Sequence, residues 1–395
     1  MDPVRNPYTP NAGARPPALA GRDDLTDQFA LVLDRVAAGR TEKGYLVTGL
    51  RGVGKTVLLG EFETLARDRG AIVIAHEAPK EAGALMRRFP GLARKALLEM
   101  SPAARWGERA RRAAGILRGF KATFDPDGRW SVTYDAADIE DVEGVGDTGD
   151  FTVDLPDVLE ALGEAVAAHQ RLIVFLIDEI QHLETRELSA LVMAKHRINR
   201  RSLPIVIAGA GLPQLPGLTA EAQTYAERMF HWPRIGQLPP EDARLALLTP
   251  ARRQGVDIDE DALAFIVDYT EGYPYFLQEY GRAIWDAAEA SPITLRDALD
   301  TQPTVEAVLD QDFFAVRVAG LPDAEIRYLQ SMAGLGPGEH SGAEVAAAMG
   351  KSASQVASAQ GRLIGRGLVY RARRGEVAFT VPQFDRYVLR AFPSD

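Results

Sequence analysis

The chain has 395 residues, of which 46% are hydrophobic and 25% charged, and its formal net charge is −10. This length is enough for two or three domains with a sizeable core. The absence of cysteine excludes disulfides and thiolate metal sites, and it suits a cytoplasmic protein. Apolar runs such as residues 172–177 are too short to cross a membrane, so no membrane partner is expected. The acidic net charge argues against a wholly basic nucleic-acid binder but leaves room for a local basic face.

The N-terminal residues 1–20 are rich in proline, glycine and alanine, which predicts an extended arm. Asp23 or Asp24 is a suitable cap for a helix that runs to about Ala38. The apolar stripe of this helix is expected at five positions: Leu25, Phe29, Leu31, Val32 and Val36.

Residues 49–56 match the phosphate-binding P-loop pattern, Gly-x-x-x-x-Gly-Lys-Ser/Thr. A β-prone run at 44–48 precedes them and an apolar helical pattern at 57–62 follows, so the order is strand, loop, helix. The glycines let backbone N–H groups converge on phosphate oxygens, and the helix N-terminus adds a favourable partial charge. Lys55 is expected to reach the β- and γ-phosphates, and the Thr56 hydroxyl to hold Mg²⁺. The predicted nucleotide-binding residues are Gly49, Leu50, Arg51, Gly52, Val53, Gly54, Lys55, Thr56 and Val57.

A buried parallel strand is predicted at residues 71–75, and residues 81–157 then exceed what a minimal nucleotide fold needs. This insertion reads as four parts: helices at 81–100 and 103–119, a hairpin at 121–134 and an acidic loop at 138–150. Between Arg87 and Lys121 there are ten basic residues and two acidic ones. These basic residues fit either a solvated helix face, paired with the acidic loop, or a surface for nucleic acid or another partner.

A second motif begins after a helix expected at residues 157–168. The apolar run 172–177 ends in Asp178 and Glu179, as in a buried strand that delivers two carboxylates to the edge of a sheet. In the Walker B pattern, Asp178 holds Mg²⁺ and Glu179 polarises the water that attacks the γ-phosphate. The alternative is a strand that ends in a solvated acidic turn.

A third apolar strand is predicted at residues 204–208. The Gly-x-Gly that follows lacks a third glycine, since Gln214 stands in its place, which excludes a dinucleotide site. Arg228 ends a predicted helix in front of a short strand, and residues 239–290 read as helices. Within these helices, Phe276, Tyr280 and Ile284 stack at helical spacing and are expected in the core.

The C-terminal part predicts three short helices at 324–332, 342–349 and 354–366. Two strands at 368–370 and 377–379 flank a turn, and together these elements suggest a winged helix. Between Lys351 and Arg374 there are six basic residues and no acid. A basic third helix and wing suit duplex DNA, whereas the alternative is a winged helix that packs on protein. The predicted DNA contacts are Arg362, Arg366, Arg371, Arg373 and Arg374.

In their order along the chain, these motifs resemble the AAA+ ATPases. The resemblance is strongest to bacterial and archaeal ATPases that are similar to origin-recognition initiators and to signal-transducing STAND ATPases. It implies an α/β fold with a parallel-sheet P-loop core at 21–238, a helical lid at 239–315 and a winged helix at 316–395. It also implies ATP and Mg²⁺ as cofactors, with Arg22 and Pro274 near the nucleotide.

Two departures from the family pattern favour slow hydrolysis. Residues 208–211 offer no polar sensor at the end of the third strand, and the helix after Gly272 lacks the usual sensor arginine. The expected function is therefore an ATP-dependent switch that binds DNA. The alternative is a STAND-like signalling or defence protein with a protein partner, whereas a small-molecule kinase lacks an acceptor pocket.

The resemblance also implies that Arg228 is an arginine finger, which enters a neighbouring subunit in a head-to-tail homo-oligomer. The alternative role for Arg228 is an intramolecular ion pair with Glu221 or Glu227.

Overall fold

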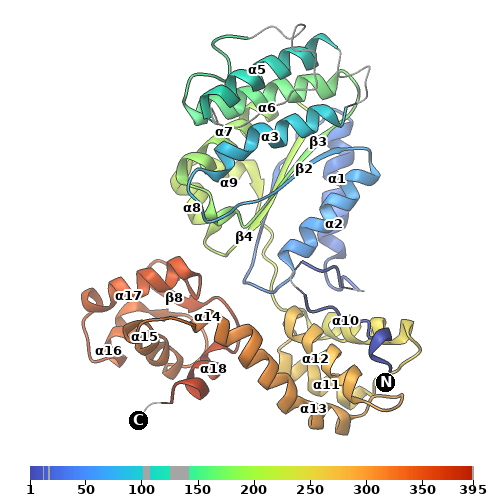
Figure 1. Ribbon diagram of the computed structural model, residues 1–395, viewed down its shortest axis with the longest axis vertical. Helices are drawn as coiled ribbons and strands as arrows, with labels where there is room; N and C mark the ends of the chain where they lie inside the picture. Colours follow the sequence, from blue (N-terminus) through green and yellow to red (C-terminus); the bar gives the residue numbers. More distant parts are fainter. Residues whose placement is uncertain (12, 17, 101–106, 125–141, 394–395) are drawn as a thin grey trace. The chain divides into compact units, whose positions relative to one another are not determined.

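The computed structural model describes the chain except for residues 12, 17, 101–106, 125–141 and 394–395. The chain divides into two compact units (Figure 1). The core unit comprises residues 23–49 and 58–234, and the lid unit comprises residues 1–22, 50–57 and 235–395. Most of the P-loop therefore groups with the lid unit, although the strand before it belongs to the core unit.

A five-stranded parallel sheet forms the middle of the core unit, in the order β2-β3-β4-β1-β5. The strands are β1 (Gly44–Thr48), β2 (Ile72–Glu77), β3 (Ile173–Asp178), β4 (Ile205–Gly211) and β5 (Phe230–His231). All residues of β1 and β4 are buried, as expected for parallel strands covered on both faces. The predicted strands are thus confirmed, and β4 continues three residues further than predicted, through Gly211.

One face of this sheet is covered by α1 (Asp23–Ala37) and α2 (Lys55–Asp68). The ring of Phe29 stacks on Phe62 at 3.9 Å and meets Tyr45 edge-on at 5.7 Å between centroids. The buried stripe of α1 is Phe29, Val32, Leu33 and Val36. The prediction for Leu31 was wrong, since it is 59% exposed, because the buried positions follow the i, i+3, i+4, i+7 pattern.

The other face is covered by α3 (Ala84–Leu98), α5 (Glu108–Phe124), α6 (Phe151–Ala167) and α7 (Thr185–Arg200). Aromatic contacts run outward from Phe175 of the sheet, through Phe89 and Phe120, to Phe151 at successive centroid distances of 5.9, 5.7 and 5.9 Å. The described helices of the insertion therefore share the main hydrophobic core. Figure 1 shows α3, α5 and α6 together on the side of the sheet away from α1 and α2.

Two predictions for the insertion need correction. Residues 121–124 belong to α5 rather than to a hairpin, because burial of Phe120 holds this turn of helix in the core. The rest of the predicted hairpin, 125–134, lies outside the described residues. Helix α6 begins at Phe151, six residues before the predicted start, because the Asp150 side chain caps it by accepting from the Thr152 N–H at 2.9 Å.

Between residues 239 and 308 the lid unit contains four helices: α10 (Pro240–Arg253), α11 (Glu260–Thr270), α12 (Pro274–Ala287) and α13 (Leu295–Val308). The predicted core residues Phe276, Tyr280 and Ile284 are all 0% exposed. The N-terminal arm packs on these helices. Tyr8 is 3% exposed and donates its hydroxyl to the carbonyl of Leu247 at 2.7 Å, and the Trp285 indole donates to the carbonyl of Asp2 at 2.9 Å.

After α13 come the π-helix η4 (Leu309–Ala315) and the three-residue helix α14 (Val316–Val318). Residues 323–391 then form a part that we call the C-terminal module. Its helices and strands are α15 (Asp323–Gly334), β6 (His340–Ser341), α16 (Gly342–Ala348), α17 (Ala353–Arg366), β7 (Val369–Arg373), β8 (Glu376–Phe379) and α18 (Phe384–Ala391). The three helices and two strands expected from the sequence are present, whereas β6 and α18 were not predicted. In the described part of the chain, no helix is both long and apolar enough to span a membrane.

Candidate functional site

The sequence motifs of the core unit meet at one edge of its sheet. In the register of the three strands, Leu46 of β1, Gly209 of β4 and Ile177 of β3 are level. Gly49, which follows β1, and Asp178, which ends β3, therefore leave the sheet at the same carboxyl edge. This edge is where ligands of open parallel sheets bind.

The P-loop has a backbone that only glycine adopts without strain. Gly52 and Gly54 have φ angles of +79° and +91°. A Cβ at Gly54 would meet no atom within 4 Å, so the loop is open on that side. Val53 anchors the loop with 1% exposure, and the Lys55 ammonium, at the start of α2, donates to the carbonyl of Leu50 at 2.7 Å. The loop is thus closed on itself with open space beside Gly54.

Three residues of the lid unit surround this loop. Tyr273, the N-cap of α12, is 0% exposed, and its hydroxyl lies 2.9 Å from where a Cβ of Gly52 would stand. Pro274 is the first residue of α12. Arg22 is 8% exposed and donates to the carbonyls of Val53 at 3.5 Å and Gly236 at 2.8 Å. Burial lowers the pKa of Arg22, while the charge of Asp242 raises it. Arg22 therefore braces the backbone of the loop.

Glu179 has a strained backbone at the end of β3. Its φ angle is +51°, a left-handed conformation that costs a side-chain-bearing residue on the order of 1 kcal/mol or more. The turn is held by the Asp178 carboxylate, which accepts from the Glu179 N–H at 2.8 Å. Such strain is found where a side chain must be aimed, which suits the predicted role of Glu179 as the residue that polarises water.

Gln181, on the short helix η3 (Ile180–His182), is a residue that the sequence reasoning missed. Its amide nitrogen donates to the Glu179 carboxylate, and its amide oxygen accepts from the Leu212 N–H at 3.1 Å. A Cβ at Gly211 would lie 2.8 Å from that oxygen. Gln181 thus supplies the polar group that β4 lacks, and the glycine at 211 leaves room for it.

The donors that the sequence assigns to Mg²⁺ suit that ion chemically. Mg²⁺ in phosphoryl-transfer sites takes one or two carboxylates together with hydroxyl, water and phosphate oxygens. Asp178 offers a carboxylate and Thr56 an exposed hydroxyl. Among the described residues, there is no cluster of three or more His, Asp or Glu that would hold a metal on its own.

Arg228 lies in the short helix α9 (Ala226–Met229) and is exposed. Within the part of the chain that the structure describes, no carboxylate pairs with it, so the ion pairs considered with Glu221 and Glu227 are not formed. Among the described residues, Arg228 is therefore an exposed cation without an intramolecular ion pair.

The five arginines predicted to contact DNA differ in their surroundings. Arg362 and Arg366 of α17 pair with Glu325, which is 0% exposed, at 2.5 and 3.3 Å between nitrogen and oxygen. Arg373 pairs with Glu339 at 3.2 Å. Arg371 and Arg374, on the β7–β8 hairpin, are exposed and have no acidic partner among the described residues. The hairpin thus presents the two available cations, whereas the α17 arginines neutralise a buried carboxylate.

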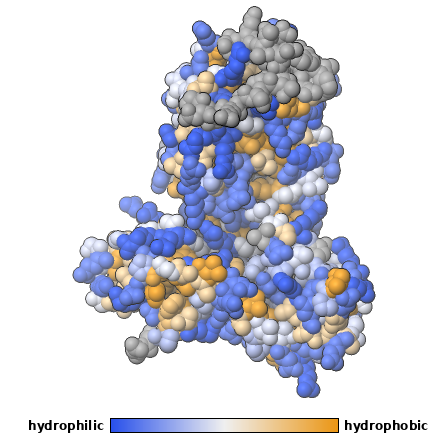
Figure 2. Space-filling view, in the orientation of Figure 1, coloured by the Kyte–Doolittle hydropathy of each residue, from blue (hydrophilic) through white to orange (hydrophobic). Residues whose placement is uncertain are grey.

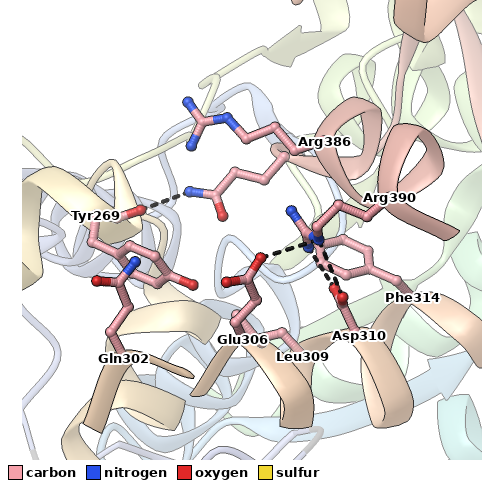
Figure 3. A pocket seen from close by; sticks show the side chains of 9 residues that line it. Tyr269, Gln302, Glu306, Leu309, Asp310, Phe314, Arg386 and Arg390 are labelled. Atoms are coloured by element: carbon pink, nitrogen blue, oxygen red, sulfur yellow. Dashed lines mark hydrogen bonds and ion pairs between the residues drawn. The ribbon is translucent and has the colours of Figure 1, made fainter. Parts of the chain in front are cut away.

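A cavity of about 250 Å³ lies where the C-terminal module meets the lid helices (Figure 3). Arg390 of α18 pairs there with Asp310 at 2.6 Å and with Glu306 at 3.0 Å. The Gln383 amide donates to the carbonyl of Tyr269 at 2.7 Å. None of the residues that line the cavity belongs to the P-loop. Its charged side chains form ion pairs, Arg390 with Asp310 and Glu306 and Arg386 with Glu271, so we assign the cavity to the joint between lid and module.

Comparisons with known proteins agree with these observations. The model of the AAA ATPase domain matches residues 18–207, and that of a domain of unknown function, DUF8462, matches residues 311–388. A search of curated proteins finds no match.

Three solved structures illustrate the similarity of fold. The Walker-type ATPase paby2304 of Pyrococcus abyssi is 14% identical, with a TM-score of 0.51 over 94% of this chain and 96% of that one. The Orc1 protein of Aeropyrum pernix, solved in complex with DNA, is 16% identical (TM-score 0.47, 98% and 96% covered). The RuvB Holliday junction branch migration motor of Thermotoga maritima is also 16% identical (TM-score 0.47, 96% and 99% covered). At 14% identity, the similarity to the ATPase of Pyrococcus abyssi concerns the fold alone.

The contact between Gly211 and Gln181 gives a first prediction. Gly211→Ala places a methyl group 2.8 Å from the Gln181 oxygen, so Gln181 must move and release Glu179. We expect ATP hydrolysis to slow at least about tenfold, with ATP affinity unchanged, because a well-placed general base typically contributes ~10²–10⁴-fold and misplacing it loses part of this factor. Gly217→Ala is the control, because a Cβ there meets nothing within 4 Å. Steady-state ATPase rates equal to wild type in Gly211→Ala would show that Gln181 does not position Glu179.

Proposed function

Since residues 18–207 match the AAA ATPase domain, we propose that this chain is a nucleotide-controlled switch. In this proposal ATP with Mg²⁺ binds at the P-loop, and the nucleotide state sets how the C-terminal module, as a winged helix, binds duplex DNA. Lys55 neutralises the β- and γ-phosphates, Thr56 and Asp178 hold Mg²⁺, and Glu179 polarises the attacking water.

The observation that carries this proposal is the set of contacts made by the P-loop inside the lid unit. Gly52 is packed against Tyr273 of α12. The Arg51 guanidinium lies 2.9 Å from where a Cβ of Gly367 would stand, and Gly367 is the C-cap of α17. The loop that would hold the phosphates thus touches both the lid and the C-terminal module. A phosphate that moves Arg51 or Gly52 therefore acts directly on both.

The joint in Figure 3 supports the proposal that a conformational change in the lid helices reaches the C-terminal module. Burial lowers the pKa of Arg390, but its hydrogen bond with Asp310 and the charges of Asp310 and Glu306 raise it overall, so the pairs favour the charged form. The π-helix η4 carries both Asp310 of this joint and Phe314, whose ring stacks on Tyr387 of α18 at 5.1 Å between centroids. Single π-turns often mark functional positions in helices.

The small number of side-chain donors near Glu179 supports slow hydrolysis of ATP. The end of β4 is Gly209-Ala210-Gly211, which offers no side-chain donor, and the first turn of α12 has no arginine. Fewer fixed donors leave less stabilisation for the charge that develops on the transferred phosphoryl group. A slow ATPase keeps its nucleotide state long enough to act as a switch.

DNA binding is proposed for the β7–β8 hairpin, because Arg371 and Arg374 are exposed there without acidic partners among the described residues. Phosphate contacts by such cations release counterions and make affinity depend steeply on salt. Substitution of Arg362 is a poor test of this idea. It would leave the buried charge of Glu325 with one cation fewer and would therefore destabilise the fold.

The test is DNA affinity, measured by fluorescence anisotropy with Mg-ATP, with Mg-ADP and without nucleotide. We expect wild-type affinity to differ at least about fivefold between ATP and ADP, the lower range of allosteric coupling. The Arg371→Ala/Arg374→Ala variant should bind more weakly, and the slope of log K against log salt should fall by up to about 1.8. Arg252→Ala/Arg296→Ala removes the same charge from exposed positions of the lid and should change neither value. Equal affinity in all three nucleotide states would contradict the switch.

A protein partner is the second candidate, as in STAND-like ATPases. Figure 2 shows hydrophobic surface on the visible face of the C-terminal module. Val316, Leu335 and Leu389, in or next to this module, are 69%, 40% and 44% exposed. Absence of salt-dependent DNA binding in the same experiment would favour this candidate.

We also propose that the working unit is a head-to-tail homo-oligomer in which Arg228 enters the neighbouring nucleotide site. An unpaired, exposed cation supports this role, because a guanidinium at the γ-phosphate stabilises the transition state, typically by ~10³-fold or more in rate. Head-to-tail contacts of this kind form rings or filaments.

A mixing experiment tests the oligomer. Arg228→Ala and Glu179→Gln should each hydrolyse ATP at least about tenfold more slowly than wild type when alone. When they are mixed, an Arg228→Ala subunit keeps its Glu179 and borrows Arg228 from its neighbour, so activity should return and rise with protein concentration. No recovery on mixing, with a wild-type rate per molecule independent of concentration, would leave a monomeric switch.

A further inference from the structure

The cavity in Figure 3 contains a carboxylate oxygen that the ion pairs of the joint leave over. The cavity, of about 250 Å³, is lined by α11, α13 and η4 on one side and by α18 with its N-cap Gln383 on the other. Arg390 donates to both oxygens of Asp310, at 2.6 and 3.3 Å, and pairs with Glu306 through Oε1 at 3.0 Å. The other oxygen of Glu306, Oε2, accepts no hydrogen bond from the described residues, so it is available to a donor inside the cavity.

Two further polar groups of this lining also lack partners. The ring of Tyr269 packs against Tyr280 at 5.6 Å between centroids, and its backbone carbonyl accepts from Gln383 at 2.7 Å. Its hydroxyl makes no hydrogen bond with a described residue, and neither does the carboxamide of Gln302. Both groups carry an oxygen that accepts hydrogen bonds, so the cavity has three acceptors to offer.

The three acceptors lie close together. Gln302 and Glu306 are four residues apart and share one face of α13, and Figure 3 shows both beside Tyr269 of α11. Burial, and then the charge of Glu306, raise the pKa of Tyr269, as expected when a hydroxyl is close to a carboxylate. One part of the cavity is thus lined by oxygens from two helices of the lid.

The charge beside these acceptors is negative. Glu306 and Asp310 share the single guanidinium of Arg390, so two negative charges face one positive charge. Arg386 also lines the cavity, but it pairs at 3.1 Å with Glu271, a carboxylate outside the lining. One negative charge is therefore left without compensation, which favours a cation and disfavours an anion.

A primary ammonium group matches this lining. It carries one positive charge and three N–H donors, and it has no acceptor. Leu309 and Phe314, both 2% exposed, add apolar surface for an aliphatic chain. Since a water molecule takes about 30 Å³, the cavity has room for a chain of a few carbons.

We propose that this cavity binds the primary ammonium group of an aliphatic amine, which donates to Glu306 Oε2, the Gln302 amide oxygen and the Tyr269 hydroxyl. The same group is supplied by a free amine or by a lysine side chain of a partner protein. This site uses no residue of the P-loop, so it goes beyond the proposed nucleotide switch and does not depend on it. Because α11 and α13 line it together with α18, an amine bound there holds the C-terminal module on the lid helices.

Calorimetric titration with butylammonium chloride at constant ionic strength tests the site. Wild type should bind it saturably, and Glu306→Gln should weaken binding about tenfold or more, the range for a hydrogen bond to a charged group. Tyr269→Phe keeps the ring and removes only the hydroxyl, so the loss should be smaller, about threefold. Glu289→Gln removes the same charge from an exposed position of the lid and should change nothing. The Tm of Glu306→Gln without ligand should stay close to wild type, because Arg390 keeps both bonds to Asp310.

Two further ligands separate the sources and the recognition. N-acetyl-lysine N-methylamide presents the ammonium group as a protein does. If it binds and Glu306→Gln weakens that binding, a lysine side chain is an occupant, whereas binding of butylammonium alone identifies a free amine. Butyltrimethylammonium keeps the charge and the chain but has no N–H donor, so it should bind at least about tenfold more weakly.

The remaining results would overturn the ammonium site. If wild type binds neither butylammonium nor the lysine derivative, the cavity holds no amine. Equal weakening by Glu306→Gln and Glu289→Gln would show that only the net negative charge of the protein attracts the ligand. Equal affinity for butylammonium and butyltrimethylammonium would show that the three acceptors recognise no N–H group.

Discussion

The backbone of the P-loop is the constraint on which the remaining structure of the site depends. Gly52 and Gly54 adopt φ angles that side-chain-bearing residues avoid, as in loops whose N–H groups converge on an anion. The same bend brings Gly52 against Tyr273, because only a residue without a side chain admits the tyrosine hydroxyl. One local conformation thus shapes the loop that we propose holds phosphate and brings this loop against the lid. A side chain at Gly52 would disturb both at once.

At the carboxyl edge of the sheet, too, residues without side chains leave room for a side chain from a neighbouring element. Strand β4 passes between β1 and β3, and its glycines at 209 and 211 leave space that Gln181 occupies from η3. Gln181 then holds the carboxylate of Glu179, whose backbone is strained by the turn after Asp178. Gln181, from η3, thus orients the Glu179 carboxylate in place of a polar side chain on β4. The geometry explains how a chain without the usual sensor residue still directs its glutamate.

The features that could be predicted from the sequence are those that short local patterns specify. The buried strands, the P-loop and the Asp178-Glu179 pair depend on apolar runs and glycine spacing, which are visible without a fold. Gln181 and Tyr273 gain their importance from contacts with residues far away in the chain, Leu212 and Gly52 respectively, so periodicity could not find them. Arg362 and Arg366 were assigned to DNA because their charge was visible, whereas their partner Glu325 lies in another helix. The end of α5 was misjudged because burial of Phe120 overrides the turn signal that follows.

Nucleotide binding at the P-loop is the claim from which the others follow, and calorimetric titration with Mg-ATP tests it most directly. Lys55 is 6% exposed and closes the loop by donating to the carbonyl of Leu50, and its ammonium is the side-chain cation proposed to neutralise the β- and γ-phosphates. Wild type should bind ATP at a single site, and Lys55→Ala should bind at least about tenfold more weakly while its Tm without nucleotide stays close to wild type. Equal ATP affinity in the two proteins would contradict a nucleotide site at this loop.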